Sequence, residues 1–148
     1  MRAVVQRTVG ASVEVAGEIV GEIACGLVVF LGIEEGDTEA DLTYICDKVT
    51  GLRVFDDENE IPNLSVCDIG GSVLLVSQFT LCADARKGKR PSYIKAARPE
   101  QAIPLYEKAI AKISQSVPVA TGVFQAMMQV RLINDGPHTI LLDSKKLF

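Results

Sequence analysis

The sequence predicts an α+β fold in which a curved, mostly antiparallel and barrel-like sheet packs with two main helices. Segments of strand, helix, strand, helix and strand character follow one another, and hairpin signals connect them rather than regular βαβ repeats. The 148 residues are 48% hydrophobic and 23% charged, without a linker, repeat or low-complexity tract. This length and composition suit one compact core, so we expect a single domain spanning residues 1–148.

Strands dominate the first part of the chain. Residues 3–9 and 11–15 are rich in β-formers, and the sequence then alternates around Gly17, which predicts a hairpin turn. Ile19–Ile23 would be the returning strand. Cys25–Ile33 is apolar on both faces, which is typical of a central strand that is covered on two sides.

The first helix is predicted from about Thr38 to Leu52, with Asp37 as its N-cap. Apolar residues at helical spacing form its buried stripe: Leu42, Ile45, Cys46, Val49 and Leu52. The acidic segment Asp56–Glu60 follows. A run of carboxylates lacks the convergent oxygens that a hard cation needs, so we interpret this segment as a solvated loop rather than a metal site.

The middle of the chain predicts one strand and the second helix. Ser72–Thr80 reads as a strand that changes from apolar to polar at its C-terminal end, where functional sites are often placed. An amphipathic helix covers Leu105 to Ile113. Either Pro104 occupies its first position or an earlier turn begins at Pro99.

Two further strands, Phe124–Ile133 and His138–Leu142, are joined by a corner at Asn134–Pro137. Gly136 has a backbone freer than that of other residues, while Pro137 fixes its own φ and makes the preceding peptide bond a candidate for the cis form. Asn-Asp-Gly-Pro is ordinary turn chemistry, so a hairpin turn is the simplest interpretation. A functional interpretation needs a second sequence element.

The four cysteines form no C-x-x-C pair, and a single histidine leaves little material for a zinc site. We expect buried, reduced thiols, although the spacing also permits a disulfide. Residues 1–7 carry charges where an export signal needs an apolar stretch. The longest apolar run, residues 25–33, is about half of the ~20 residues that span a bilayer. We therefore expect a soluble, cytoplasmic protein without a membrane partner.

Charge is distributed unevenly along the chain. The formal net charge is −4, yet residues 83–98 contain six lysines and arginines against one aspartate. An acidic body with one basic loop argues against indiscriminate nucleic-acid binding and favours local contact with an anion such as phosphate. A solvated charged loop explains the same residues equally well.

The sequence contains few of the motifs and side chains that usually carry catalysis. The chain lacks the signatures of phosphate-binding loops, dinucleotide-binding folds, zinc hydrolases and serine hydrolases, so no metal or cofactor is expected. His138 lies in the predicted turn, and Cys82 has no evident partner that would activate it. Ser77 and Thr80 offer hydroxyls, which in a strand are more often hydrogen-bonded than nucleophilic. An enzyme with these tools would rely on backbone dipoles and on the substrate's own groups, which suits an activated ester.

Two segments taken together carry a family resemblance. Ser77–Leu81 and Asn134–Thr139 resemble the paired signature motifs of the D-aminoacyl-tRNA deacylase family, also called D-tyrosyl-tRNA deacylases. The likeness continues in order through residues 1–7, 51–55, 63–66 and 87–93. It therefore covers essentially the whole chain.

The resemblance implies a homodimer that hydrolyses the ester joining a D-amino acid to the terminal adenosine of tRNA. In this family the Gly-Pro bond is cis, and the pair from one subunit enters the active site of the other. Carried over, Gly136 and Pro137 would form a chiral gate held by Arg7. The catalytic wall around the ester would consist of Ser77, Gln78, Phe79 and Thr80. The tRNA acceptor end would be contacted by Arg86, Lys87, Lys89 and Arg90.

A rigid backbone gate would exclude L side chains by collision while accepting many D side chains. Glycine has no side chain to collide, so glycyl-tRNA is an expected second substrate. Thr80 would attack the ester, orient water or donate a hydrogen bond. We favour assistance by the ribose 2′-hydroxyl of the substrate, which makes a protein nucleophile unnecessary.

Two positions depart from the family pattern. His138 stands where a small aliphatic residue is frequent, and Gln125 stands where glycine is common. Neither belongs to the Gly-Pro pair or to Ser77–Thr80, so they bear on substrate preference more than on reaction class. Two rival hypotheses remain: a non-enzymatic RNA-binding module, and a structural dimer or hydrolase of a small ester that is not RNA.

Overall fold

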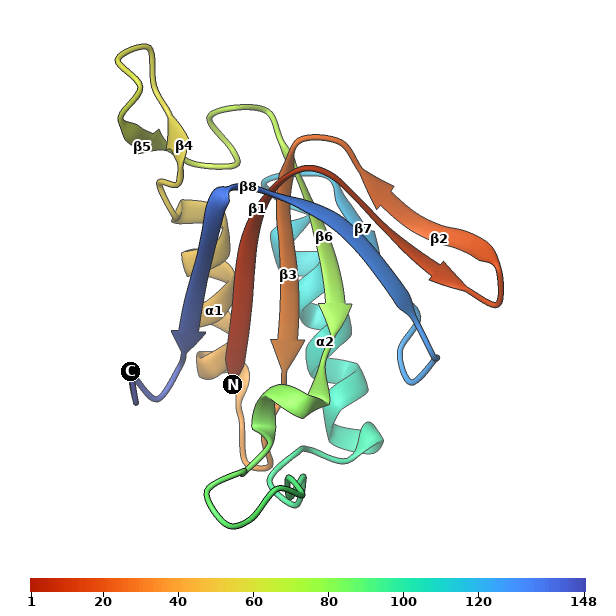
Figure 1. Cartoon of the computed structure of the whole chain (residues 1–148). Helices are drawn as coiled ribbons and strands as arrows, with labels where there is room; N and C mark the ends of the chain where they lie inside the picture. Colours follow the sequence, from red (N-terminus) through yellow and green to blue (C-terminus); the bar gives the residue numbers. More distant parts are fainter.

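The computed structural model describes residues 1–148 and contains one large sheet, a small hairpin and two helices (Figure 1). In chain order, the elements are β1 (Arg2–Val15), β2 (Glu18–Ile23), β3 (Gly26–Gly32), α1 (Glu39–Gly51), β4 (Phe55–Asp56), β5 (Pro62–Leu64), β6 (Ser72–Ser77), the 3₁₀ turn η1 (Phe79–Cys82), α2 (Pro99–Ile113), β7 (Val119–Thr121) and β8 (Gln129–Asp143). The α+β class with two main helices is confirmed.

The sheet runs in the order β2-β1-β3-β6-β7, and β8 pairs with β1. β1 is antiparallel to β2, β3 and β8, whereas β3–β6 and β6–β7 are parallel, so the sheet is mixed. A Cβ added at Gly21 of β2 would collide with the carbonyl of Thr121 in β7, which shows how closely the two ends of the sheet approach. The curved sheet is therefore nearly closed, as the barrel-like prediction requires.

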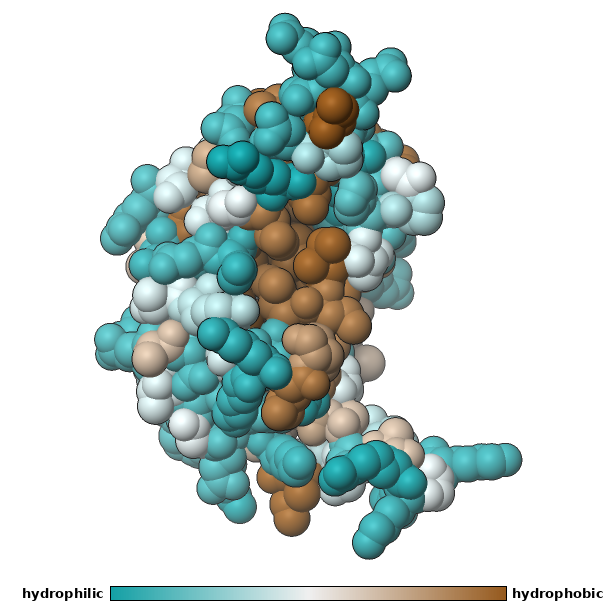
Figure 2. Space-filling view, turned by 90° about the vertical axis from the view of Figure 1, so that its left-hand side faces the viewer, coloured by the Kyte–Doolittle hydropathy of each residue, from teal (hydrophilic) through white to brown (hydrophobic).

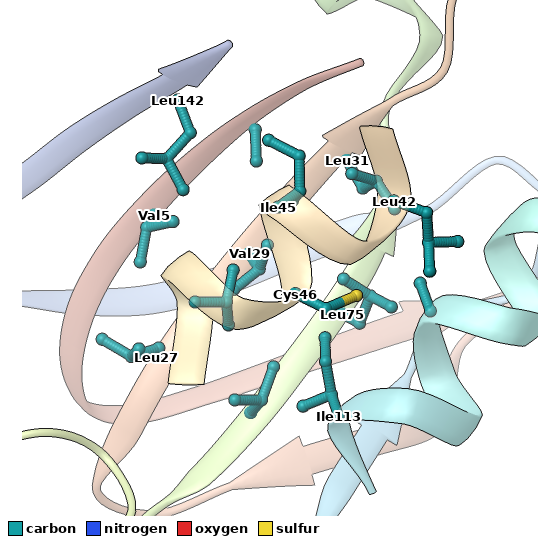
Figure 3. Close-up of a cluster of buried hydrophobic side chains, with 14 of the residues drawn as sticks. Val5, Leu27, Val29, Leu31, Leu42, Ile45, Cys46, Leu75, Ile113 and Leu142 are labelled. Atoms are coloured by element: carbon teal, nitrogen blue, oxygen red, sulfur yellow. The ribbon is translucent and has the colours of Figure 1, made fainter. Parts of the chain in front are cut away.

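Both helices cover the same face of the sheet (Figure 1). Val29 of β3 and Leu75 of β6 point toward Ile45 of α1 and Ile113 of α2 in the main core (Figure 3). Alternate residues of these strands, such as Val28, face a second, smaller cluster on the concave side. The predicted two-sided burial of the central strand is confirmed.

Helix α1 begins one residue later than its predicted cap suggests. Thr38 is the N-cap and forms a capping box with Asp41, whose carboxylate accepts from the Thr38 backbone N–H at 2.8 Å and hydroxyl at 2.9 Å. The predicted cap, Asp37, is wrong because its buried carboxylate is used elsewhere. It accepts from the Met1 ammonium at 2.7 Å and from the Glu34 N–H at 2.7 Å.

Helix α2 begins at Pro99, the earlier of the two starts that the sequence allowed. Proline suits this first position because the N–H it lacks would have no partner within the helix. Pro104, the other candidate, lies inside the helix. The apolar face of the helix buries Leu105 and Ile113 among other residues.

β6 is three residues shorter than predicted, because the chain leaves the strand after Ser77 and turns into η1. A larger difference concerns the C-terminal strands. Most of the two predicted strands forms one long strand, β8, and the corner at Asn134–Pro137 is not a hairpin turn. β8 begins at Gln129, so the predicted start of the first strand at Phe124 is wrong. β8 pairs with β1 on both sides of the corner, so the corner is a bulge within the strand.

All four cysteines are free. Cys46 and Cys82 are buried, and burial raises the pKa of each thiol to about 11. Cys25 and Cys67 are exposed, which corrects the expectation that every thiol is buried. No helix has the length and apolar character needed to cross a bilayer.

Candidate functional site

A pocket of about 680 Å³ opens at the C-terminal end of β6. Its lining combines the end of the sheet, the start of α2 and the segment before β8: Leu31, Ile33, Val76, Ser77, Gln78, Phe79, Thr80, Ala96, Ala97, Pro99, Ala102, Phe124, Gln125, Ala126, Met127, Met128 and Val130. None of these side chains is an acid, a base or a thiol. The pocket can therefore bind apolar groups and present hydroxyls, amides and backbone dipoles, but it contains no side chain suited to general acid–base catalysis.

The polar wall of the pocket is held by the backbone of β3. The N–H of Gln78 donates to the carbonyl of Leu31 at 2.8 Å, which fixes the exit of β6 beside β3. A Cβ added at Gly32 would lie 2.9 Å from Leu81 Cβ and 3.0 Å from the Gln78 carbonyl oxygen. Glycine at position 32 thus allows the 3₁₀ turn to pack directly on the end of β3.

Two consecutive amides at this turn have no hydrogen-bond acceptor within the chain. The N–H groups of Phe79 and Thr80 take part in none of the backbone or side-chain hydrogen bonds outside regular elements, and they open the first turn of η1. First-turn N–H groups of a helical turn have no partner within it. The hydroxyl of Thr80 is hydrogen-bonded to the side-chain amide of Gln78. This segment can stabilise a negative oxygen, as the resemblance requires of a wall around an ester.

The second predicted motif is held by Arg7, whose side chain is largely buried. Its Nη1 donates to the carbonyl of Val54 at 2.8 Å, and its Nε lies 3.2 Å from the Asp135 carbonyl oxygen and 3.1 Å from the Asp135 carboxylate. The Gly136–Pro137 peptide bond is cis, and Gly136 has a φ of 121°. The structure therefore places Arg7 directly against the corner.

The corner overlaps a bulge of four unpaired residues, 135–138, that lie opposite Arg7 of β1, because Gln6 pairs with Thr139 and Thr8 pairs with Asn134. The side chain of Asn134 closes it. Its Oδ1 accepts from the backbone N–H of His138 at 3.0 Å, and its Nδ2 donates to the Thr139 hydroxyl at 3.0 Å.

The two motifs lie far apart within one chain. Leu31 of β3 pairs with Ser77, whereas Leu27 of β3 pairs with Arg7, so the two sites are displaced by four residues, about 13 Å, along the strand. β8 and β6 are also three strand spacings apart across the sheet, roughly 14 Å. A distance on the order of 20 Å therefore separates the corner from the pocket. Figure 1 shows the bend of β8 and the C-terminal end of β6 at opposite ends of the sheet.

The predicted RNA-binding residues lie on the loop that follows η1. Backbone hydrogen bonds between Asp84 and Ser92, at 2.8 and 2.9 Å, close the base of this loop. Arg86 pairs with Asp84, and its hydrogen bonds hold the pKa of that carboxyl well below its usual range. The other three cations form no ion pair within the chain: Lys87, Lys89 and Arg90.

Sequence reasoning missed the apolar half of the pocket. Phe124 and the following residues to Met128 line it, and Phe124 packs against Tyr106 with ring centroids 5.7 Å apart. The buried Tyr106 hydroxyl donates to the Leu75 carbonyl at 2.8 Å, and burial raises its pKa to about 12. The sequence showed only an apolar segment here, with Gln125 as a departure from the family pattern.

Comparison with known protein families identifies the family of this chain. A family model described as "D-Tyr-tRNA(Tyr) deacylase" matches residues 4–143. The chain belongs to this family. The family resemblance that was inferred from the two signature motifs is therefore confirmed.

Curated relatives in the deacylase family are similar along their entire length. The D-aminoacyl-tRNA deacylase of Koribacter versatilis (strain Ellin345) is 59% identical over 149 residues, with 100% of both chains covered. That of Desulfitobacterium hafniense (strain DSM 10664 / DCB-2) is 56% identical over 149 residues, again with 100% of both chains covered.

Solved structures share the fold. One, named "c-Myc DNA Unwinding Element Binding Protein", has a TM-score of 0.92 and 40% identity, and the match covers 97% of this chain and 98% of that chain. Another, described as a probable eukaryotic D-amino acid tRNA deacylase, has a TM-score of 0.80 at 15% identity, covering 96% and 98%. The latter likeness concerns the fold alone.

Proposed function

We propose that this protein hydrolyses the ester bond of D-aminoacyl-tRNA and of mischarged glycyl-tRNA, releasing free tRNA and the amino acid. Membership of the deacylase family over residues 4–143 carries the proposal. The pocket supports it, because the residues that carry two free amides and two hydroxyls line a cavity without titratable side chains. Such a site suits an ester, which is already activated, better than an amide.

The chemistry rests on the first turn of η1. When water attacks the ester, the carbonyl oxygen becomes negatively charged. The N–H groups of Phe79 and Thr80 are the hydrogen-bond donors available to that carbonyl oxygen. No side chain of the pocket can take the proton from water. The ribose 2′-hydroxyl next to the ester is the remaining candidate. It can accept the proton of the attacking water while it passes its own proton to the leaving 3′ oxygen, so its fixed proximity would replace a protein base. In this scheme Thr80 orients the substrate and is not a nucleophile.

Selection for the D isomer is assigned to the Gly136–Pro137 corner of a second copy of the chain. Within one chain the corner is on the order of 20 Å from the pocket, so a site that contains both motifs needs two copies. The side of the molecule on which β8 ends carries a continuous apolar area in Figure 2. Separately, two large apolar side chains of β8, Ile133 and Leu141, are exposed. Apolar areas of this kind are typical of protein interfaces. A homodimer explains both observations.

The corner is suited to chiral selection because its backbone is held from several sides. Arg7 binds the Asp135 carbonyl, and Asn134 binds the His138 N–H. A fixed backbone wall collides with an L side chain whatever its chemistry and leaves space for a D side chain. A glycyl ester is not excluded by this backbone wall, because glycine has no side chain that could collide with it.

The loop between Asp84 and Ser92 would contact phosphates of the tRNA acceptor end through Arg86, Lys87, Lys89 and Arg90. The acidic remainder of the chain limits contact to this loop. We expect the enzyme to work in the cytoplasm, where tRNA is charged.

The deciding experiment measures release of tyrosine from matched D- and L-tyrosyl-tRNA against a control without protein. We expect rapid release from the D ester alone. Equal rates on both esters would refute the gate, and undetectable glycyl release at high enzyme concentration would refute the glycine corollary. The variant Thr80→Val tests the role of the hydroxyl, since near-normal turnover excludes an obligatory threonine nucleophile.

A non-catalytic nucleic-acid-binding module is the second candidate. The basic loop favours it, and so does the similarity to a solved protein whose name describes binding to a DNA unwinding element. This candidate predicts binding of tRNA without release of the amino acid from either isomer. The same assay therefore separates the two functions.

A further inference from the structure

Two aromatic side chains stand exposed between the pocket and the basic loop. Phe79 is 58% exposed and Tyr93 is 42% exposed. Their ring centroids are 5.3 Å apart and their planes meet at 67°, an edge-to-face pair. Large apolar rings are usually covered in a folded chain, so an exposed pair beside a pocket suggests a surface that a ligand covers.

The backbone fixes Tyr93 at this place. The hydrogen bonds between Asp84 and Ser92 close the basic loop immediately before Tyr93. Beyond it, the Ala96 N–H donates to the Tyr93 carbonyl at 3.0 Å, and the Ala97 N–H donates to the Ile33 carbonyl at 2.9 Å. Tyr93 is therefore held between the closed base of the loop and two residues of the pocket lining, Ala96 and Ala97.

Three surfaces consequently follow one another: the pocket, the aromatic pair, and the unpaired cations of the loop. Phe79 belongs to both the pocket lining and the pair. Lys87, Lys89 and Arg90 have no acidic partner within the chain. Aromatic rings that alternate with cations are how proteins hold single-stranded RNA, because bases stack on the rings while phosphates meet the cations.

We propose that Tyr93, together with Phe79, is a stacking platform for the unpaired base that precedes the terminal adenosine of the acceptor end. This inference rests on the proposed function, in which the terminal nucleoside ester occupies the pocket. The nucleotide that precedes the terminal adenosine must lie outside the pocket, because the RNA strand has to run from the pocket toward the loop that binds its phosphates. The aromatic pair lies on that route, and it gives Tyr93 a role in RNA positioning that no charged residue of the loop can supply.

The test compares two substrates. One is D-tyrosyl-adenosine, esterified at the 3′ oxygen, which lacks the preceding base. The other is a D-tyrosyl RNA minihelix with an unpaired ACCA end. The variants are Tyr93→Leu, which keeps apolar bulk but loses the ring, and Tyr93→Phe, which keeps the ring. Ile94→Ala is the matched control, because Ile94 is the adjacent residue and is 83% exposed.

We expect Tyr93→Leu to raise KM for the minihelix about tenfold relative to its effect on D-tyrosyl-adenosine, within the range that base stacking supplies. Tyr93→Phe should restore the wild-type value, and Ile94→Ala should match wild type on both substrates. A loss of equal size on the two substrates would mean that Tyr93 only supports Phe79, and it would overturn the platform. No loss on either substrate would overturn it as well.

Binding of the uncharged minihelix, measured by fluorescence anisotropy, decides the matter independently of turnover. Equal affinities of wild type and Tyr93→Leu would overturn the inference, as would absence of minihelix binding by the wild type. If the wild type binds the minihelix with a dependence on the Tyr93 ring but hydrolyses neither ester, the proposed function fails while the platform stands.

Discussion

The backbone of Gly136 gives the sharpest test of the corner. Its φ of 121° lies in a region that residues with a Cβ rarely adopt. A Cβ added there would lie 3.2 Å from Arg7 Nη2 and 3.2 Å from the His138 backbone nitrogen. The guanidinium can yield by a few tenths of an ångström, but the backbone nitrogen is held by Asn134. We therefore expect Gly136→Ala to strain the bulge and not merely to fill space.

The expected cost follows from these contacts. Placing a residue with a side chain in such a backbone region lowers the free energy of unfolding by roughly 1–3 kcal/mol. Because the new Cβ would also contact the His138 backbone, we take a value of about 2 kcal/mol for Gly136→Ala. For a domain of this size, each kcal/mol lowers Tm by roughly 2–4 °C, so a fall of about 4–8 °C is expected in a thermal melt followed by circular dichroism. The matched control is Gly10→Ala, since a Cβ at Gly10 would meet nothing within 4 Å.

The same variant tests the gate. If the corner of one copy selects the ester in the pocket of another, Gly136→Ala should lower kcat/KM for D-tyrosyl-tRNA at least tenfold, whereas Gly10→Ala should not. A Tm equal to that of Gly10→Ala would refute the strain argument. Unchanged activity, together with a lowered Tm, would show that the corner matters for stability and not for substrate selection.

Three further predictions follow from other contacts. Gly32→Ala should displace the 3₁₀ turn, cost about 1–3 kcal/mol in urea unfolding and lower kcat, because its Cβ would press on the Gln78 carbonyl; an unaltered kcat would contradict the close packing. Burial opposes ionisation of Asp41, but hydrogen bonds from Ser144 and Thr38 lower its pKa to about 2, below the value of 3.8 expected when unfolded. Asp41→Ala should therefore cost about 1 kcal/mol at pH 6 through its lost hydrogen bonds, and urea titrations should show this difference shrinking as pH falls from about 4 through 2; a constant difference would argue against an ionised Asp41 carboxylate. Replacing the three unpaired cations of the loop by serine should reduce the slope of log affinity for tRNA against log salt by about 2–3, and an unchanged slope would exclude their contact with phosphate.

Local pattern predicted most elements, and tertiary contacts decided the rest. The alternation around Gly17 and the apolar run of β3 correctly predicted a hairpin and a buried strand, because both depend on side-chain periodicity. Asp37 has the residue type of an N-cap, but the Met1 ammonium and the Glu34 N–H occupy its carboxylate. The local sequence around Asp37 cannot predict the contact with the Met1 ammonium, which lies 36 residues away in the sequence.

The corner illustrates a similar limit. Asn-Asp-Gly-Pro predicts a reversal of the chain, yet β8 continues on the same side of β1 because Gln6 and Thr8 pair on either side of the bulge. Only the partner strand distinguishes a bulge from a hairpin. The pocket shows the same dependence, since Ser77–Thr80 was found from its motif, whereas Phe124 and its neighbours join the site through the closure of the sheet.

The separation of the two motifs has a genetic consequence. If each site of a dimer takes its pocket from one copy and its corner from the other, a chain with a damaged Ser77–Thr80 segment still carries an intact corner. A chain with a damaged Gly136 still carries an intact pocket. Two alleles that are each inactive alone would then complement one another when expressed together, because a mixed dimer assembles one site entirely from undamaged parts. Two alleles damaged in the same motif would never do so.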